Sequence, residues 1–311
     1  MEGNKDNSRL NGALDRRSFL KLSGLLGLGL GVPSIVPASA EAVRFNRKAF
    51  KVSETRLAMG TFVSMTLIHS SRDKAEDGMG KAFQEIDRLS HSMSRFDEAT
   101  AVAKLNREGF LEDLPPEITQ VVSRALDYYR LTQQSFDITV KPVVDLFKET
   151  FATGSATLPG ENDLGQVLEL VGSDKIELRG RNIRFRKPGM AITLDGIAKG
   201  YIVDRASRIL ISQRIKNHLI NAGGDIRTMG SRSDKKAWTV AIQDPKKQQQ
   251  YPDVIHLNDA AVATSGNYEV YFDREKMFHH IVNPRTGGSP QLSTSVSVMA
   301  QTAMDADALS T

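Results

Sequence analysis

The chain has 311 residues, of which 40% are hydrophobic and 25% charged, proportions that exclude a collagen, a coiled coil, a wholly disordered chain and a polytopic membrane protein. Because the 41 basic residues barely outnumber the 37 acidic ones, a net charge of +4 gives no basis for nucleic-acid binding. The absence of cysteine further excludes disulfides, thiolate nucleophiles and zinc–thiolate sites.

The first forty residues have the features of an export signal. Paired arginines, Arg16-Arg17, are followed by an apolar, glycine-rich stretch over residues 22–32 and by Ala38-Ser39-Ala40, which matches a small-x-small cleavage site. The apolar stretch is shorter than the ~20 residues needed to span a bilayer. We therefore expect a twin-arginine signal peptide over residues 1–40 and a mature protein in the periplasm. The alternative is a disordered basic N-terminus.

Residues 41–52 are expected to be a linker, and residues 53–311 one domain that could divide into two lobes. Strands are predicted over 54–68 (interrupted at Gly60), 176–178, 183–185, 219–221, 238–243, 254–257, 261–263, 268–272 and 294–299. Helices are predicted over 73–94, 116–131 and 197–211, with a last one opening near Thr302. Residues 136–147 show a mixed pattern, and 150–160 and 246–250 are expected to be surface connections. Because strands and helices interleave without a regular βαβα order, we predict an α+β fold, with mixed or antiparallel sheets flanked by helices.

The segment 193–200 combines an acid, two glycines and a lysine where an extended segment is expected to lead into a helix. The unpaired amides of a helix start, with Lys199 close by, favour an anion such as a phosphate. The alternative is that Asp195 caps the helix and Lys199 is solvated.

A second segment, Gly223-Gly224-Asp225, follows the predicted strand 219–221. Paired glycines permit positive φ and let the backbone approach a ligand closely. The alternative is a tight turn that an Asp side chain stabilises.

A third segment begins with His279-His280 and continues through Asn283-Pro284-Arg285-Thr286-Gly287-Gly288. Adjacent histidines in a strand point to opposite faces, so at most one of them faces a given site. Such a histidine can accept a proton near neutral pH, or it can be a hydrogen-bonded structural residue.

A fourth segment carries Asp305, Asp307 and Thr311 in the predicted last helix. Residues four apart share a helix face, so Asp307 and Thr311 are neighbours while Asp305 points elsewhere. A carboxylate with a hydroxyl is a pair of hard oxygen ligands that suits Mg²⁺. The alternative is that the pair decorates a solvent face.

Taken together, these segments resemble the ApbE family of flavin transferases (FAD:protein FMN transferases). Further blocks match that family: Met59-Gly60-Thr61, Ile86-Asp87-Arg88-Leu89, Met93-Ser94-Arg95-Phe96-Asp97, Leu105-Asn106, Phe136-Asp137-Ile138-Thr139-Val140-Lys141-Pro142 and Ala263-Thr264-Ser265-Gly266-Asn267-Tyr268-Glu269. The blocks occur in family order from about residue 55 to the end. Members of the family continue beyond the position of Thr311, so we expect a domain that is truncated at the C-terminus within its last helix.

The resemblance implies an ApbE-like, T-fold-related architecture and an enzyme that uses Mg²⁺ to split the pyrophosphate of FAD. FMN would pass to a Thr or Ser hydroxyl of an acceptor protein as a phosphoester, and AMP would leave. The acceptor would be a membrane redox subunit or a secreted flavoprotein. The alternatives are an FAD pyrophosphatase, in which water replaces the hydroxyl, and a non-catalytic periplasmic FAD-binding protein.

The resemblance also implies roles for particular residues. The metal ligands would be the backbone carbonyl of Gly196 and the side chains of Asp307 and Thr311. Met59 and Phe96, the latter usually Tyr in the family, would contact flavin or adenine rings. The nucleotide site would be lined by Asp195, Lys199, Gly223, Gly224 and Asp225, and closed by Ser265, Tyr268, Pro284, Thr286 and Gly287. His280 would also border the nucleotide and accept the proton of the acceptor hydroxyl, with Asp307 as the competing candidate for the base.

Overall fold

The computed structural model describes residues 41–46, 49–152, 158–232, 235–242, 253–266, 279, 281–290 and 295–311. All of these belong to a unit that runs from Ser39 to Thr311. The expected export signal, the connection 246–250, the strand 268–272 and the site residues Tyr268 and His280 lie outside the described residues. Among the described helices, none is long and apolar enough to cross a membrane.

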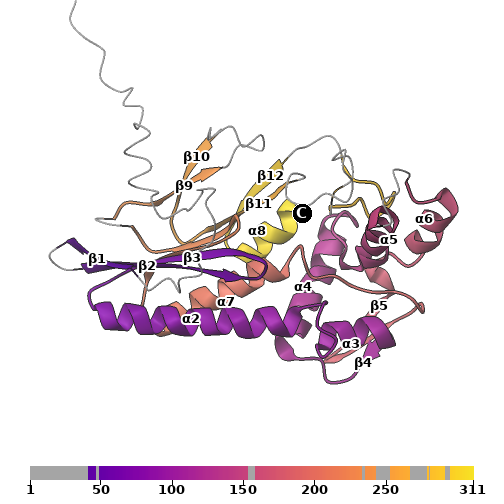
Figure 1. The fold of residues 1–311 in the computed structure, drawn as a ribbon, viewed down its shortest axis with the longest axis horizontal. Coiled ribbons are helices and arrows are strands. Elements are labelled where there is room, and N and C mark those ends of the chain that lie inside the picture. The colour runs from indigo at the N-terminus through magenta and orange to yellow at the C-terminus, as the bar shows by residue number, and fades with distance from the viewer. Residues whose placement is uncertain are drawn as a thin grey trace, which may run out of the picture. The chain divides into compact units, whose positions relative to one another are not determined.

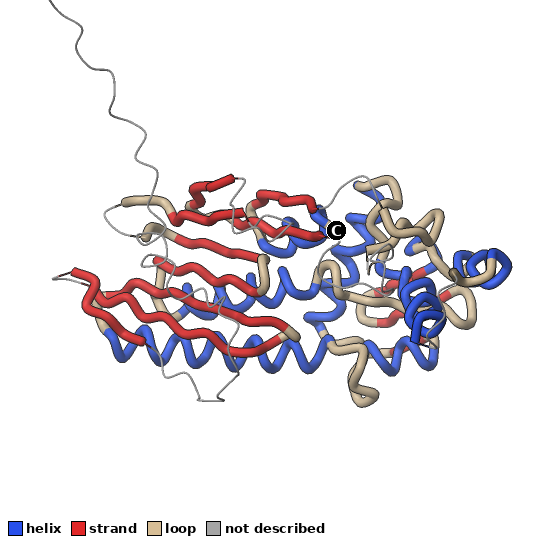
Figure 2. Tube along the Cα trace, turned by 45° about the horizontal axis from the view of Figure 1, so that its top comes forward, coloured by secondary structure: helices blue, strands red, loops and turns tan. Residues whose placement is uncertain are grey.

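A seven-stranded sheet, in which every strand is antiparallel to its neighbours, forms the centre of the fold (Figures 1 and 2). In spatial order it contains β1 (Glu41–Asn46), β2 (Ala49–Ala58), β3 (Thr61–His69), β7 (Asn217–Ala222), β8 (Asp225–Met229), β11 (Ala261–Gly266) and β12 (Ser295–Ala300). The strands of each hairpin, β2–β3 and β7–β8, are joined by two residues with positive φ, as two-residue hairpin turns require. Because Val63 at the start of β3 pairs with Ala222 at the end of β7, both turns lie at one end of the sheet.

Two long helices cover one face of this sheet, α2 (Arg72–Met93) and α7 (Ala198–Ser212) (Figure 1). α2 begins at Ser71, whose hydroxyl accepts a hydrogen bond from the Lys74 amide, and it buries a stripe with helical spacing. That stripe, which includes Met79, Phe83 and Ile86, packs with the inward side chains of β2, β3 and β7 in the main hydrophobic core.

The last helix, α8 (Ala303–Ser310), packs against α7 and the strands β11 and β12 (Figure 1). The backbones of α7 and α8 approach so closely that a Cβ on Gly200 would lie 2.3 Å from the carbonyl oxygen of Ala303. Asp204 of α7 accepts hydrogen bonds from the amides of Ala303 and Met304, both at 3.0 Å. These contacts set the position of α8 against the start of α7.

On the opposite face of the sheet lies a separate hairpin of β9 (Trp238–Ile242) and β10 (Asp253–Leu257) (Figure 1). It packs onto β8 and β11 through a small apolar cluster that contains Ile226, Val240, Leu257 and Val262.

A second, three-stranded sheet has β6 (Asn182–Phe185) between β4 (Phe110–Leu111) and β5 (Ile176–Arg179). The remaining helices are α3 (Ala101–Glu108), α4 (Pro116–Leu131), α5 (Lys141–Ala152), α6 (Glu161–Leu168) and two short 3₁₀ turns, Ile138–Val140 and Ser173–Lys175. α5 and α6 share an apolar cluster of their own around Val143, Phe147 and Val282.

The predicted α+β fold with antiparallel sheets is confirmed, as are the helices over 73–94, 116–131 and 197–211. The segment 41–52, expected to be a linker, instead contributes β1 and the start of β2. These strands pair through backbone hydrogen bonds, which the amino-acid composition of the segment does not reveal. The loop expected over 150–160 begins later than predicted, because α5 continues to Ala152. α3, α5, α6 and β8 were not predicted; α6 is only eight residues long and contains no buried residue.

Candidate functional site

Gly196, Asp307 and Thr311 lie together where the start of α7 meets the end of α8. The amide of Gly200 donates a hydrogen bond to Oδ2 of Asp307 at 2.9 Å, and the Thr311 hydroxyl donates to the Asp307 carbonyl oxygen at 3.1 Å. Thr311 also presses against Gly196, where an added Cβ would lie 2.9 Å from Cγ2 and 3.1 Å from Oγ1 of the threonine. Gly196, the Asp307 carboxylate and the Thr311 hydroxyl are therefore brought to the same junction between α7 and α8.

This group of oxygens suits a hard divalent cation. Mg²⁺ prefers oxygen ligands and is commonly held by only one or two protein carboxylates, its other positions being taken by water or phosphate. Within the described part of the chain no cluster of three His, Asp or Glu side chains could hold a metal, so a site here depends on the backbone and a hydroxyl. We therefore take Gly196, Asp307 and Thr311 as the residues that could hold Mg²⁺.

Asp307 is 4% exposed, so it does not decorate a solvent face. Burial, and next the nearby carboxylate of Asp225, raise the pKa of Asp307 well above its ordinary value. Asp305, two residues earlier, points away as predicted: it accepts hydrogen bonds from the Tyr128 hydroxyl at 2.5 Å and from Arg124 at 3.2 Å. The carboxylates of Asp305 and Asp307 therefore point to different sides of α8 and bind different groups.

Lys199, in the first turn of α7, reaches across to the start of β8. Its Nζ lies 3.3 Å from Oδ2 of the buried Asp225, so the expected alternative of a simply solvated lysine is wrong. Burial raises the pKa of Asp225, and the charge of Lys199 opposes that rise. Asp225 and Lys199 are thus close enough to the candidate metal ligand Asp307 for their charges to act on it.

The Gly223-Gly224 turn packs against the turn of the neighbouring hairpin. Gly223 has a φ of 61°, and a Cβ there would lie 2.4 Å from the hydroxyl oxygen of Thr61. The amide of Gly224 donates to the side-chain oxygen of Asn221 at 3.0 Å, so Asn221, not Asp225, stabilises the turn. Met59, in the adjacent turn, is only partly buried and adopts a φ of 53°.

Ser265, near the end of β11, joins the end of α8. Its hydroxyl oxygen lies 2.9 Å from that of Ser310 and 3.3 Å from that of Thr311. The sheet end and the last helix are therefore linked directly at the candidate metal ligands.

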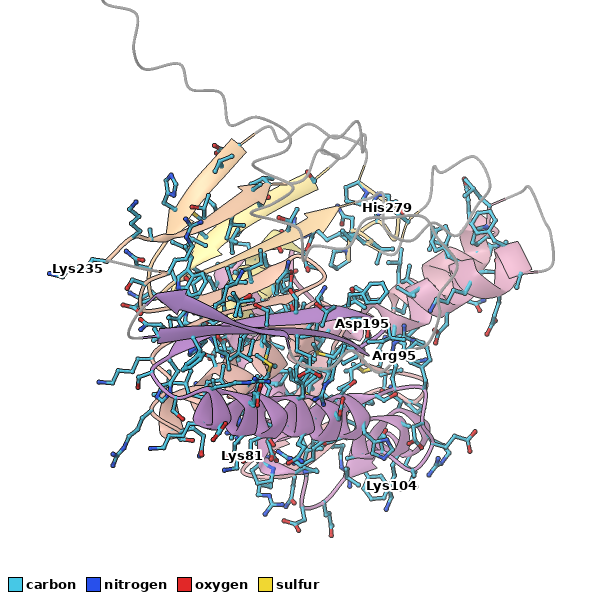
Figure 3. The ribbon with its side chains drawn as sticks, turned by 60° about the vertical axis from the view of Figure 1, so that its left-hand side comes forward. Lys81, Arg95, Lys104, Asp195, Lys235 and His279 are labelled. Atoms are coloured by element: carbon cyan, nitrogen blue, oxygen red, sulfur yellow. The ribbon has the colours of Figure 1, made fainter. Side chains whose placement is uncertain are left out.

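Asp195 does not cap α7, which begins after Ile197 without a side-chain cap. Oδ2 of Asp195 instead accepts two hydrogen bonds from Arg95, at 3.1 Å from Nε and 2.9 Å from Nη2 (Figure 3). The Arg95 guanidinium also lies 4.3 Å from the centre of the Phe96 ring, which is 74% exposed. An exposed aromatic ring held beside a charged pair is a surface on which a planar ligand can stack.

The two parts of the third segment lie in different surroundings. His279 is buried; its amide donates to the Ser289 hydroxyl, and its Nε2 lies 3.0 Å from the Pro290 carbonyl oxygen. The loop that follows, with Pro284, Thr286 and Gly287, places Gly287 against Leu164 and Val143, beside α6 and α5. Among the described residues no hydrogen bond or ion pair connects this loop, which the resemblance implied would close the nucleotide site, to the candidate metal ligands Gly196, Asp307 and Thr311.

Several residues near the site were not proposed from sequence. Asn106 exchanges two hydrogen bonds with the backbone of Ile192, at 2.7 and 2.9 Å, and so orients the segment that leads to Asp195. Arg95 and Asn106 belong to sequence blocks that match the family, and this match could have identified them. No sequence feature pointed to Lys148, because no helix was predicted around it.

The chain matches the ApbE family over residues 59–311. It is 30% identical over 236 residues to the FAD:protein FMN transferase of Vibrio cholerae, covering 73% of this chain and 71% of the relative. It is 29% identical over 246 residues to the enzyme of the same name from Haemophilus influenzae, covering 74% and 71%.

Solved structures agree with these sequence matches. The ApbE protein of Thermotoga maritima superimposes with a TM-score of 0.75 at 30% identity, over 84% of this chain and 85% of that one. The flavin transferase ApbE of Vibrio cholerae, at 24% identity and a TM-score of 0.72, shares the fold over 84% of this chain and 85% of its own. This protein therefore belongs to the ApbE family.

Proposed function

We propose that this protein transfers FMN from FAD to a Thr or Ser hydroxyl of an acceptor protein, depends on Mg²⁺ and releases AMP. Flavin transfer to a protein is supported by the names of the relatives. The finer statement rests on one observation, the meeting of Gly196, Asp307 and Thr311 beside Lys199 and Asp225. Oxygen ligands and a lysine next to a helix start suit a bound pyrophosphate.

The proposed reaction needs little nucleophilic chemistry from the enzyme, because the nucleophile belongs to the acceptor. The acceptor hydroxyl oxygen attacks the phosphorus of the FMN half, the bond from that phosphorus to the bridging oxygen breaks, and AMP leaves with the bridging oxygen. The hydroxyl proton passes to His280, with Asp307 as the competing base. Mg²⁺, when bound by Gly196, Asp307 and Thr311, would neutralise negative charge on the pyrophosphate.

The protein would orient the dinucleotide with the groups already described. Lys199 supplies positive charge at the start of α7. The glycines of the Gly223-Gly224 turn would let its backbone approach the ligand closely. The Phe96 ring, with Met59, offers apolar surface to a flavin or adenine ring.

The test is to incubate the mature protein with FAD, MgCl₂ and a candidate acceptor that contains a Thr or Ser. The acceptor mass should rise by one FMN unit while AMP appears in the chromatogram in equal amount. Free FMN and AMP without an acceptor adduct would instead identify a pyrophosphatase. Bound, intact FAD after prolonged incubation with Mg²⁺ would identify a non-catalytic binding protein.

We further propose that the protein is exported to the periplasm by the twin-arginine route. This rests on Arg16-Arg17, the apolar stretch that follows and the cleavage pattern at Ala38–Ala40. N-terminal sequencing of protein from a periplasmic extract should begin at Glu41, and replacement of both arginines by lysine should retain the precursor in the cytoplasm. An unprocessed N-terminus in the extract would contradict the proposal.

A further inference from the structure

Arg95 and Lys148 lie beside the exposed Phe96 ring, and the charge of Lys141 acts on Lys148. These three basic side chains differ in the groups that neutralise their charges. Arg95 donates two hydrogen bonds to Asp195. Lys141 forms an ion pair with Asp145, four residues later on α5. The third, Lys148, stands one turn further along α5, with its Nζ 5.7 Å from the centre of the Phe96 ring.

Lys148 has no hydrogen-bond partner and no carboxylate within 4 Å among the residues that the structure describes, although its side chain is half-buried. Burial, and next the charge of Arg95, hold the pKa of the Lys148 ammonium below its ordinary value. The carboxylates of Asp145 and Asp195 act on it only from a distance, and each has a closer partner. A half-buried ammonium of this kind is stabilised when an electron-rich group approaches it.

The position of Lys148 indicates which ligand it would meet. It lies beside the Phe96 ring, which is 74% exposed and hence free to stack with a planar group. Arg95, beside the same ring, ties Asp195 in place, and Asp195 directly precedes the candidate metal ligand Gly196. Lys148 is therefore directed to the same space as the dinucleotide of the proposed reaction.

We propose that Lys148 is a binding residue for FAD, and that its ammonium donates a hydrogen bond to an electron-rich oxygen of the dinucleotide. The inference rests on the proposed function, because it takes FAD as the ligand. The oxygen belongs either to a carbonyl of the flavin ring that stacks on Phe96 or to the pyrophosphate. Arg95 and Lys141, whose charges are already paired, hold the surrounding carboxylates and leave Lys148 available.

The test measures binding by the mature protein without Mg²⁺, so that no turnover contributes. Dissociation constants for FAD, riboflavin and ADP are determined by titration calorimetry for the wild type, Lys148→Met and Lys148→Arg. Methionine keeps the apolar stem and removes only the charge, whereas arginine keeps the charge. Lys104→Met, on the exposed side of α3 and distant from Arg95 in Figure 3, is the matched control. Circular dichroism and thermal unfolding check that each variant is folded.

Lys148→Met should raise the Kd for FAD about tenfold, as expected for the loss of a charge-assisted hydrogen bond, while Lys148→Arg and Lys104→Met stay within about threefold of wild type. An equal loss with riboflavin but not ADP assigns the oxygen to the flavin ring, and an equal loss with ADP but not riboflavin assigns it to the pyrophosphate. Unchanged FAD binding by a folded Lys148→Met protein overturns the inference and leaves the proposed function intact. A wild-type protein that fails to bind FAD overturns both.

Discussion

The amide of Gly200, in the first turn of α7, donates a 2.9 Å hydrogen bond to the carboxylate of Asp307 in the last turn of α8. This bond joins residues 107 positions apart and fixes one carboxylate oxygen at the positive end of a helix. Since Thr311 is attached to the same turn, the geometry of the candidate metal site depends on how these two helices meet.

Replacement of Asp307 by alanine should abolish Mg²⁺ dependence and turnover, because it removes the carboxylate ligand. The fold should persist, since the other contacts of α8, including those from Asp204, are retained. Transfer rates measured against Mg²⁺ concentration check this. Asp305→Asn, which changes the opposite side of the same helix, should keep the Mg²⁺ dependence; unaltered activity of Asp307→Ala would contradict the metal assignment.

Gly200→Ala should lower the free energy of unfolding by about 1–3 kcal/mol, because the new Cβ would meet backbone atoms of Ala303 and Met304 at 2.3–2.7 Å and force α8 away. The displacement should also weaken Mg²⁺ binding. Urea unfolding and a Mg²⁺ titration measure the two effects. The control is Gly80→Ala within α2, where no atom lies within 4 Å of the added Cβ; it should be neutral or stabilising by up to about 1 kcal/mol.

Arg95→Met should weaken FAD binding by several-fold, because Asp195 loses its two hydrogen bonds and Phe96 loses the guanidinium beside its ring. The loss of binding free energy should be only about 1–2 kcal/mol, because Asp195 is largely exposed and water partly replaces the lost arginine. Fluorescence quenching of FAD provides the measurement. Arg88→Met, which breaks ion pairs with Glu85 and Glu117, should leave the affinity unchanged.

His218 should make the protein sensitive to acid. Its ring is buried, its Nδ1 donates to the Ile215 carbonyl at 3.0 Å, and its Nε2 accepts from the Ser207 hydroxyl at 2.8 Å, an arrangement that suits the neutral ring. Burial lowers the pKa of His218 from 6.5 to about 4. Because the pKa of His218 is lower in the folded than in the unfolded protein, the neutral ring contributes to the free energy of unfolding. That contribution is fully present above pH 6.5 and is lost as the pH falls towards 4.

The loss between those two pH values should amount to about 3 kcal/mol. It is measured as the difference in pH dependence of unfolding free energy between the wild type and His218→Gln, which cannot titrate. His256→Gln, at an exposed position on β10, should keep the wild-type dependence. Parallel curves for the wild type and His218→Gln would disprove the assignment.

His280→Ala should slow FMN transfer more than it weakens FAD binding, because the proposed role of His280 is to accept the proton of the acceptor hydroxyl. Single-turnover rates and the Kd for FAD, determined on the same preparation, separate the two effects. Equal losses in both would demote His280 to a binding residue and favour Asp307 as the base.

Several helices and the spacing of two candidate metal ligands could be predicted from local patterns in the sequence. Apolar residues at helical spacing predicted α2, and Pro116 marked the start of α4, because helix periodicity and first-turn preferences are properties of neighbouring residues. The one-turn spacing of Asp307 and Thr311 likewise placed both residues on one face of a helix, and away from Asp305.

Tertiary structure decided which of these segments meet. That Gly196 lies against Thr311, that Lys199 pairs with Asp225 and that Arg95 holds Asp195 depends on antiparallel pairing and on the close approach of α7 and α8. The strands β1 and β8 were not predicted either: β1 is stabilised by backbone pairing with its neighbour β2, and β8 by pairing with β7 and with the distant strand β11. Contacts between distant residues arise from packing of the whole chain, whereas composition and spacing report only on near neighbours.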